Sequence, residues 1–412
     1  KYDYEDLIAF DYDLDNDLDI IFLANKEDYS RQIFETKIEL LRNNGEGKFE
    51  LESDKFPRMN SQGSIIRINS NPANEVTDIF IGGKTRIMGY PYSDKSLIFR
   101  KINGEFKNVT DKVFGSFKPK GIIKDAHWVD LNNDKRKDLV IVSEFYPIQI
   151  YLHKNGKLVL SEKNGIENYS GWWQSIESID SDNDGDMDLL IGNIGSNNHY
   201  NISKDTPVTL FSKDFDENGF EDPIIFSFSK SKQGNMKMYP VTFWGNLNRQ
   251  SPFFRKKFKS YKQFGSADFN KIFSKEELKG AIKLEVNFDK TCLIENLGNG
   301  KFKVHILPLK SQFAPIYDFE KVDLNNDNLL DLLLIGNDYG NEPFIGPYDA
   351  LSGLVLINNG GNTFEVMEEE KSNFIVPGNA RDIEKMTNSK GDNSFLVSQN
   401  SGELLLFEMS KK

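Results

Sequence analysis

The sequence has little cysteine, little histidine and no long apolar run. Among its 412 residues there is one cysteine, Cys292, and there are four histidines, at 127, 153, 199 and 305. One cysteine excludes a disulfide scaffold and a cysteine-based zinc site, and the histidines lack metal-ligand spacing. No apolar run approaches the ~20 residues needed to cross a bilayer. Residues 1–6 show no signal peptide, so we expect a processed or trimmed chain.

Positive charge is also scarce. The chain carries 51 Lys and Arg against 63 Asp and Glu, a net charge of −12, which argues against nucleic acid as a partner. The 32 phenylalanines exclude a disordered chain. We find no G-x-S-x-G, H-E-x-x-H or phosphate-binding G-x-x-x-x-G-K-[ST] motif. No catalytic or organic cofactor-binding residue is therefore assigned, although paired acids for glycoside hydrolysis remain open.

What the sequence does contain is a repeat. Five segments share the pattern D-x-[DN]-x-[DN]-x-x-x-D, at 11–19, 130–138, 180–188, 214–222 and 323–331. Strand-like runs flank them, such as 7–10 and 20–23 in the first unit, and the second run is apolar at consecutive positions. Such runs are typical of strands covered on both faces. Two degenerate echoes, at Asp78 and near Asp392, bring the count to seven units, whose loops end near 19, 78, 138, 188, 222, 331 and 394.

Asn-Gly turns recur further along most units and predict a second hairpin in each. They lie at 43–47, 103–104, 155–156, 296–300 and 358–361. Two hairpins make four strands, so the chain is predicted to be all-β, a single seven-bladed β-propeller over 1–412. The 34-residue interval between the fourth and fifth loops predicts a shortened blade. The 109-residue interval that follows predicts a helical insertion at about 230–290, in the fifth blade.

The acidic loops predict metal binding, because carboxylates packed into a nine-residue turn repel one another without a cation. Positions 1, 3, 5 and 9 offer side-chain oxygens and position 7 a carbonyl, a hard oxygen set that suits Ca²⁺. We expect about five structural Ca²⁺ ions. The EF-hand is excluded, because its twelfth-position Glu is replaced by an apolar residue in all five loops. The candidate metal residues, including the residue at position 7, are Asp11, Asp13, Asp15, Asp17, Asp19, Asp130, Asn132, Asp134, Arg136, Asp138, Asp180, Asp182, Asp184, Asp186, Asp188, Asp214, Asp216, Asn218, Phe220, Asp222, Asp323, Asn325, Asp327, Leu329 and Asp331.

These loops, with the strand that follows each, resemble the FG-GAP/VCBS repeats of integrin-like β-propellers. The stretch 168–310, with Ser170-Gly-Trp-Trp-Gln174, Tyr239-Pro240 and Glu295-Asn-Leu-Gly-Asn-Gly-Lys-Phe302, resembles surface VCBS-repeat proteins of the Bacteroidota. Those are relatives of the cartilage-acidic-protein group, often encoded beside SusC/SusD-type transporters. The resemblance implies a non-catalytic, lipid-anchored accessory subunit of a TonB-dependent nutrient-uptake complex on the outer face of the outer membrane. A SusC-like transporter and a SusD-like lipoprotein are its implied partners.

Two alternatives stay open: a lectin-like propeller that binds a glycan or peptide, and a propeller hydrolase or lyase. Within the insertion, Pro252 followed by Phe254, Phe258 and Tyr261 predicts one amphipathic helix, and Ser274 with Glu277 predicts a capping box. The basic residues around 255–262 favour a solvated face over nucleic acid, with docking as an equal alternative. Trp172 and Trp173 are expected in the core. The loops 197–200 and 337–341 are candidates for ligand contact.

Overall fold

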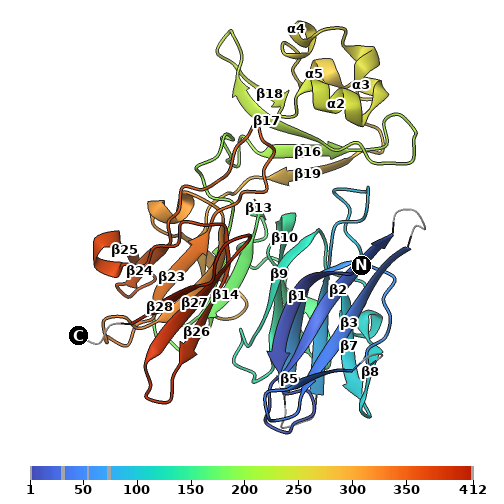
Figure 1. Ribbon diagram of the computed structural model, residues 1–412. Coiled ribbons are helices and arrows are strands. Elements are labelled where there is room, and N and C mark those ends of the chain that lie inside the picture. Colours follow the sequence, from blue (N-terminus) through green and yellow to red (C-terminus); the bar gives the residue numbers. More distant parts are fainter. Residues whose placement is uncertain (1, 29–32, 53–54, 72–75, 410–412) are drawn as a thin grey trace.

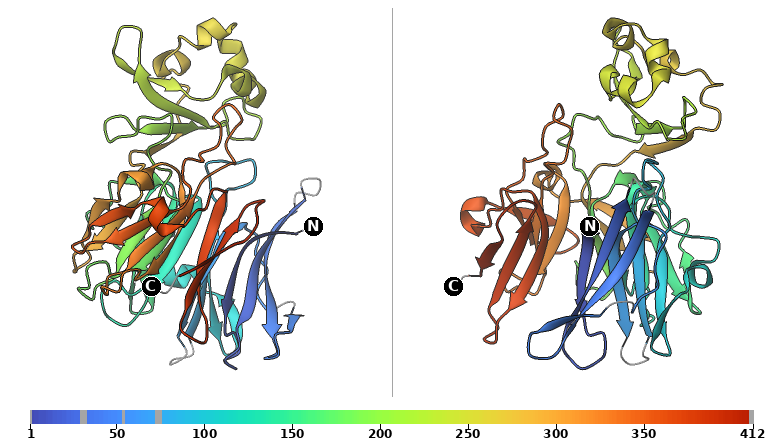
Figure 2. Two further views of the ribbon diagram at one scale, coloured as in Figure 1. Left: turned by 60° about the vertical axis from the view of Figure 1, so that its left-hand side comes forward. Right: turned by 45° about the vertical axis from the view of Figure 1, so that its right-hand side comes forward.

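The computed structural model describes residues 2–28, 33–52, 55–71 and 76–409, and these residues form mostly β-sheet. Six of the seven sheets stand side by side around a common axis, and the seventh lies above them with most of the helices (Figures 1 and 2). We call the six sheets the ring. The all-β prediction is confirmed. Within the described residues, no helix is long and apolar enough to span a membrane.

Most sheets of the ring run in chain order, each strand antiparallel to the last. The first sheet is β1 (Tyr2–Phe10), β2 (Asp19–Asp28), β3 (Ile33–Asn43) and β4 (Phe49–Glu52), and the second is β5 (Gly63–Asn71), β6 (Val76–Gly83), β7 (Leu97–Ile102) and β8 (Glu105–Asn108). The third is β9 (Ile123–Val129), β10 (Asp138–Pro147), β11 (Gln149–Lys154) and β12 (Lys157–Leu160), with β13 (Ser170–Trp172) on the far end of β10. The fifth is β22 (Ile316–Val322), β23 (Asp331–Gly336), β24 (Leu354–Asn358) and β25 (Phe364–Met367), and the sixth is β26 (Ala380–Thr387), β27 (Asn393–Gln399) and β28 (Leu405–Glu408). Short helices α1 (Thr110–Phe114) and α6 (Glu369–Ser372) and the 3-10 turn η2 (Leu309–Gln312) lie between strands.

The insertion interrupts the fourth sheet, whereas the prediction placed it in the fifth blade. Its strands are β14 (Ser175–Ile179), β15 (Asp188–Gly192), β20 (Cys292–Asn296) and β21 (Phe302–Ile306), and Ile191 of β15 pairs directly with Cys292 of β20. The segment 193–291 therefore leaves the fourth sheet at the end of β15 and returns to it at the start of β20. We call this segment the excursion. The expected shortened fifth blade at 222 is wrong, because the loop 214–222 lies inside this excursion. The spacing between successive acidic loops does not distinguish a short blade from a repeat that lies inside an insertion.

The excursion forms its own small sheet and helical cap. The sheet, in the order β18-β17-β16-β19, consists of β16 (Val208–Ser212), β17 (Ile224–Lys230), β18 (Met236–Pro240) and β19 (Ile282–Val286). The helices are α2 (Trp244–Gln250), α3 (Pro252–Lys257), α4 (Tyr261–Phe264) and α5 (Phe269–Ile272). A phenylalanine-rich cluster joins the helices to the sheet and includes Phe226, Phe254 and Phe273. Figure 1 shows this unit above the ring.

The helix prediction for the insertion is correct at its start and wrong in its length. Pro252 opens α3, but the helix ends at Lys257 because Phe258 has extended backbone angles. Phe254 and Phe258 are buried, whereas Tyr261 begins α4 and is exposed. The capping box does form: Ser274 N–H donates to Glu277 Oε2 at 2.8 Å, and Glu277 N–H to Ser274 Oγ at 3.2 Å. It closes a turn after α5.

The hydrophobic cores lie between neighbouring sheets. Leu139 and Ile141 of β10 pack toward the second sheet, while Val140 and Val142 of the same strand pack toward the fourth. A strand with neighbours on both sides needs apolar side chains at every position, because successive side chains point to opposite faces. The prediction of strands covered on both faces is confirmed, as are the Asn-Gly hairpins in the first, second, third, fourth and fifth sheets.

The innermost strands follow one another around the axis in the order β1, β5, β9, β14, β22 and β26. A β-bulge interrupts five of them near their start, between residues 4 and 6, 63 and 65, 123 and 125, 316 and 318, and 380 and 382. Bulges of this kind increase the local twist and redirect the next side chain. They bring a charged residue to the axis in several sheets.

Candidate metal centres

The five acidic loops share one hydrogen-bond pattern. In each, the first Asp accepts backbone N–H groups from positions 5, 6 or both, such as Asp15 N–H to Asp11 Oδ1 at 3.1 Å and Asn16 N–H to Oδ2 at 3.0 Å. The position 7 N–H donates to the side-chain oxygen at position 5, as Asp17 does to Asp15 at 3.0 Å. The side chains at positions 1 and 5 are thereby folded over the same turn.

The chain takes a left-handed conformation at positions 4 and 6 of every loop. The ten residues with positive φ are Leu14, Asn16, Asn133, Lys135, Asn183, Gly185, Glu217, Gly219, Asn326 and Asn328. Only two of them are glycine. Left-handed backbone is costly for residues such as Leu and Lys, so the shared pattern reflects a constraint on this turn rather than the preference of each residue.

The aspartate at position 9, which is predicted as a ligand, also fastens the loop to its sheet. It is buried in all five loops. Both of its oxygens accept backbone N–H groups in four loops, whereas Asp222 accepts one, from Phe215 at 3.0 Å. Asp19, for example, accepts from Tyr12 at 2.8 Å and from Asn43, on β3, at 2.8 Å. Burial, with a smaller effect of neighbouring loop acids, raises the pKa of Asp138 and Asp222 to about 6. Position 9 thus anchors the loop to its own sheet.

Carboxylate oxygens converge in three loops. Those of Asp11, Asp13 and Asp15, of Asp180, Asp182 and Asp184, and of Asp214, Asp216 and Asp222 all lie within 4.8 Å of one another in their respective loops. The loops 130–138 and 323–331 have Asn132 and Asn325 at position 3, so an amide oxygen replaces one carboxylate there. Three of the five loops therefore bring three carboxylate oxygens together.

Two carboxylate oxygens support a bound cation directly. Among the described residues, Oδ1 of Asp180 and Oδ1 of Asp216 are buried and have no hydrogen-bond partner. An unsatisfied buried charged oxygen is strongly unfavourable. A hard divalent cation in each of these two loops would satisfy its unpaired oxygen, and a set of ligands made only of oxygen fits Ca²⁺. The residues of the acidic loops thus fit Ca²⁺, and bound Ca²⁺ stays a prediction.

The two degenerate units hold other interactions in place of acidic loops. Asp78, which corresponds to position 9, is buried and forms a two-point ion pair with Arg100, at 2.6 and 2.7 Å. Residues 72–75 of its loop lie outside the described residues. In the sixth sheet, a turn at 388–392 joins β26 to β27, and Asn388 Nδ2 donates to Asp392 at 3.2 Å. A guanidinium supplies the positive charge in the second sheet.

The loops of the third, fourth and fifth sheets touch one another. The side-chain amide of Asn133 bonds to Asp186, and that of Asn183 donates to the carbonyl of Asn328 at 3.0 Å. The hairpin asparagines add a second set of links. Asn358 Nδ2 donates to Ser181 O at 2.8 Å, which ties the fifth sheet to the loop of the fourth. The Asn-Gly hairpin motif thus also joins neighbouring sheets.

A ring of axial charges was missed by the sequence analysis. Asp6, Asp125 and Asp318 each follow a bulge, and each accepts an N–H from the innermost strand of the next sheet: Ile66 at 2.9 Å, Ile176 at 3.0 Å and Ile383 at 2.9 Å. These are the axial aspartates. Each lies five residues before the first Asp of its acidic loop, so an extended motif D-x-x-x-x-D-x-[DN] would have found them.

Arg67 on β5 bridges two of the axial aspartates, with Nη1 2.6 Å from Asp6 and Nη2 2.5 Å from Asp125. Burial opposes its charge, but Asp125 and Asp6 outweigh burial and raise the pKa of Arg67. On the other side of the axis, Asp318 faces Asp382 of β26. Burial and then Asp382 raise the pKa of Asp318, and burial also raises that of Asp382. The two carboxyl groups are therefore set to share a proton.

The other sequence candidates have mainly structural contacts. Trp173 is buried and donates its indole N–H to Tyr146 O at 2.8 Å. Trp172 packs against Phe145 and Tyr200, so core packing is confirmed for the pair. Asn337 is buried and donates to Leu351 O and Gly378 O. The loops that begin at 197 and 337 lie near each other, since Tyr348 Oη is 3.4 Å from His199 Nδ1.

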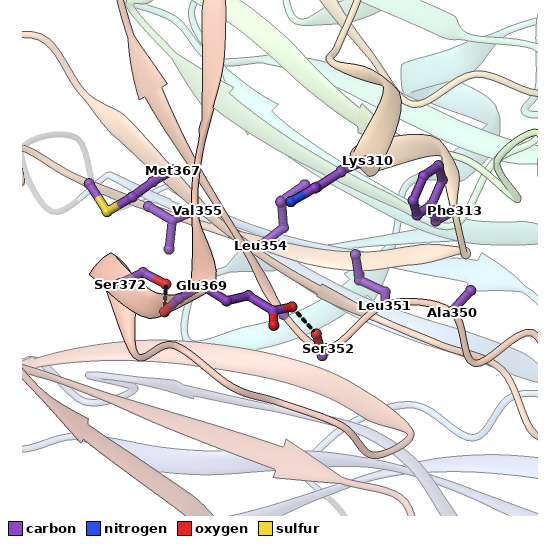
Figure 3. Close-up of a pocket in the computed structure, with 11 residues that line it drawn as sticks. Lys310, Phe313, Ala350, Leu351, Ser352, Leu354, Val355, Met367, Glu369 and Ser372 are labelled. Atoms are coloured by element: carbon purple, nitrogen blue, oxygen red, sulfur yellow. Dashed lines mark hydrogen bonds between the residues drawn. The ribbon is translucent and has the colours of Figure 1, made fainter.

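A cavity of about 160 Å³ lies on the outer side of the fifth sheet (Figure 3). Leu354 and Val355 of β24 line it together with Lys310, Phe313 and Glu369. The carboxylate of Glu369 bonds to Ser352. Its volume is below the ~300–1,000 Å³ usual for small-molecule sites, so we assign it no function.

The comparisons support the repeat and the fold class. Residues 130–191 match the family model described as FG-GAP-like repeat. This segment contains the loops of the third and fourth sheets. With the radial arrangement of the sheets, the match supports a β-propeller-like protein built from FG-GAP repeats. The comparison with curated proteins found no match.

Similar solved structures are distant. A GH32 beta-fructofuranosidase from Bombyx mori is 8% identical over 54% of this chain and 65% of its own, just under two thirds of its length, with a TM-score of 0.28. The Vibrio cholerae biofilm matrix protein Bap1 is 9% identical over 98% and 87%, with a TM-score of 0.32. An exo-beta-1,3-galactanase from Clostridium thermocellum is 10% identical over 98% and 92%, with a TM-score of 0.30. At these scores we base no functional argument on them.

Proposed function

We propose that this protein is a non-catalytic binding or scaffold module whose repeats are held by about five structural Ca²⁺ ions. The observation that carries the proposal is the shared hydrogen-bond pattern of the five acidic loops. Carboxylate oxygens converge in three of the loops, and Oδ1 of Asp180 and Oδ1 of Asp216 are buried without a hydrogen-bond partner. A cation at each loop would stabilise the folded state by mass action, because the unfolded chain lacks the site.

The proposal extends to a place of action. By resemblance to surface VCBS-repeat proteins, we propose an accessory lipoprotein of a SusC/SusD-type, TonB-dependent nutrient-uptake complex at the outer face of the bacterial outer membrane. The axial and loop acids are already engaged with backbone N–H groups, Arg67 or one another, and the loop acids are assigned to metal. This supports binding rather than catalysis as the role of the ring.

The insertion offers the surface for such a partner. Phe243, 55% exposed, contacts Phe344 of the fifth sheet's loop with ring centroids 4.4 Å apart. Asn246 next to it donates to Glu342 at 3.2 Å. Tyr261, 71% exposed, packs edge-on against Trp244. Exposed aromatic residues are enriched at protein interfaces. Phe243 lies where the excursion meets a loop of the ring, whereas Tyr261 begins α4 at the far end of the excursion (Figure 1).

The test is mass spectrometry of the proteins that co-purify with the native protein from mild-detergent membranes in Ca²⁺ buffer. We expect a TonB-dependent transporter and a SusD-like lipoprotein in stoichiometric amounts, and their loss from the Phe243→Asp variant. Phe117→Asp is the matched control, because Phe117 is 56% exposed and lies in the loop after α1, in the ring rather than in the insertion. A protein that purifies alone would contradict the transporter assignment and make glycan binding the leading function. Turnover of a polysaccharide that is lost on mutation of acids outside the loops would contradict the non-catalytic assignment.

A further inference from the structure

Positive charge is concentrated in one part of this acidic chain. Residues 230–281, which run from the end of β17 to the start of β19 and include α2 to α5, carry 12 Lys and Arg against 3 Asp and Glu. All other residues together carry 39 Lys and Arg against 60 Asp and Glu. We call residues 230–281 the cap. A chain of net charge −12 thus contains one segment of net charge +9.

Two of the three acids of the cap are already paired with lysines of the cap. Lys237 Nζ lies 2.6 Å from a carboxylate oxygen of Asp268, and Lys257 Nζ lies 2.6 Å from one of Glu277. Glu276 is therefore the one acid left for the ten other cations of the cap. The positive charge of the cap is not neutralised from within.

Five of these cations lie on the outer side of the short helices, around an exposed tyrosine. The helices turn Phe254 and Phe264 inward, and both are buried. The exposed cations on or next to α2, α3 and α4 are Arg249, Arg255, Lys256, Lys259 and Lys262. Among the described residues, no carboxylate forms an ion pair with any of the five. Tyr261, which is 71% exposed, lies between Lys259 and Lys262 in the sequence. Cations beside an exposed aromatic residue are typical of surfaces that lie against lipid headgroups.

The cap and the acidic loops of the ring lie at opposite ends of the molecule. The excursion leaves the fourth sheet at the end of β15, whereas the acidic loop 180–188 precedes the start of that strand. The acidic loops of the third and fifth sheets contact this loop at the same end. Figure 1 shows the cap above the ring. An extended anionic surface would attract the cap and repel the far end of the ring, so it would orient the whole molecule with the cap toward it.

We propose that the cap is a docking surface for an anionic lipid surface. Lipid phosphates contact the five exposed cations, and Tyr261 enters the headgroup layer, where an apolar ring with a polar hydroxyl is favourable. A lipid surface fits better than nucleic acid, because most of the molecule is acidic and would be repelled by a flexible polyanion that wraps around it. The charge separation instead extends over the length of the molecule, as an extended planar partner requires.

The test is co-sedimentation of the 412-residue chain with vesicles in Ca²⁺ buffer. The vesicles consist of phosphatidylcholine alone or with about 30% phosphatidylglycerol, which supplies the anionic headgroups. Lys256→Glu combined with Lys262→Glu reverses two exposed cations of the cap. Lys154→Glu combined with Lys157→Glu is the matched control. It changes the net charge equally at two exposed cross-strand neighbours in the third sheet, next to the acidic loop of that sheet.

We expect the parent chain to bind the anionic vesicles and not phosphatidylcholine alone, with an affinity that falls as salt is added. The cap variant should bind at least tenfold more weakly, because each cation near an anionic lipid surface contributes about fivefold to the affinity. The control variant should stay within about twofold of the parent, because its lysines lie far from the lipid. Tyr261→Ala should weaken binding without changing its salt dependence, since it removes the ring and leaves the charge.

Four outcomes would overturn the proposal. One is a parent chain that does not sediment with the anionic vesicles. Another is an equal loss in both double variants, which would show that only the net charge matters. A cap variant that binds like the parent would assign the binding to the ring and its Ca²⁺. Tighter binding of a single-stranded oligonucleotide, lost in the cap variant alone, would assign the cap to nucleic acid. The vesicles contain lipid alone, so this inference and the proposed transporter partner can fail independently.

Discussion

Asn296 of the fourth sheet donates its side-chain amide to the carbonyl of Leu131, 2.9 Å away in the acidic loop of the third sheet. The same amide reaches Met187 O at 3.2 Å, and its oxygen accepts the N–H of Gly298. One hairpin residue thus holds two acidic loops in a fixed relation. Asn358 repeats the arrangement one sheet further along.

Asn296→Ala is expected to lower the free energy of unfolding by about 2–3 kcal/mol, since one buried and two part-buried hydrogen bonds of about 1 kcal/mol each are lost. Urea unfolding monitored by fluorescence measures this. Asn359→Ala, at an exposed position of the equivalent turn in the fifth sheet, should change the free energy by less than about 0.5 kcal/mol. Equal effects of the two substitutions would show that Asn296 acts only within its own turn.

Calcium binding can be counted. Native mass spectrometry of the protein in Ca²⁺ buffer should show about five bound ions, and EGTA should lower the Tm. Each occupied site stabilises the fold by about 2.7 kcal/mol at a hundredfold excess over Kd. Asp180→Asn should remove one ion, whereas Asp205→Asn, at an exposed acid outside the loops, should retain all of them. A Tm that EGTA leaves unchanged would refute the structural role of the metal.

Arg67→Met is expected to cost about 3–5 kcal/mol at pH 7, because it leaves Asp6 and the buried Asp125 without their shared cation. Lys48→Met is the control, since its pair with Glu46 at 3.1 Å is exposed on both sides and should contribute little. The loss at Arg67 should shrink at low pH, where the aspartates can be protonated. Chemical denaturation at pH 7 and pH 4.5 distinguishes this from a loss of packing alone.

The carboxyl pair of Asp318 and Asp382 predicts a pH dependence of stability. Both pKa values are raised in the folded protein, so the folded state holds a proton that the unfolded chain has released above about pH 4. Stability should therefore fall as the pH rises from about 4 through the raised pKa.

Asp382→Asn removes one charge and keeps a donor toward Asp318. We expect a higher Tm than that of the parent at pH 8, and a difference that disappears near pH 4. Differential scanning calorimetry across this range is the measurement. A variant that melts below the parent at pH 8 would show that ionised Asp382 stabilises the fold, through Arg67 for example.

The repeat loops were predictable because their chemistry is local: ligand spacing, flanking apolar runs and Asn-Gly turns all fall within short windows. What sequence reading missed depends on contacts between sheets. The 34-residue interval before Asp222 predicts a short blade only if repeats that are adjacent in the sequence are also adjacent in the ring. Pairing of Ile191 with Cys292 shows otherwise.

The buried role of the position 9 aspartates was missed for the same reason. Asp331 accepts an N–H from Asn358, on another strand 27 residues away. Arg67 belongs to no sequence motif. Its role as a bridge can be recognised only from Asp6 and Asp125, which lie on neighbouring strands. The burial and the bonding partners of these side chains depend on the tertiary structure, whereas the spacing of metal ligands can be read from the sequence.

The excursion at 193–291 leaves and returns on adjacent strands, and its two ends are fastened there by Asn193 N–H to Thr291 Oγ1 at 3.2 Å and Gly195 N–H to Asp289 O at 2.9 Å. The pairing of β15 with β20 therefore does not depend on the length of the segment between them. The excursion is tied to the ring mainly there and through Val208 and Leu210, which pack with Phe145 of the third sheet. Variation among relatives should therefore concentrate here, and so should differences in what they bind.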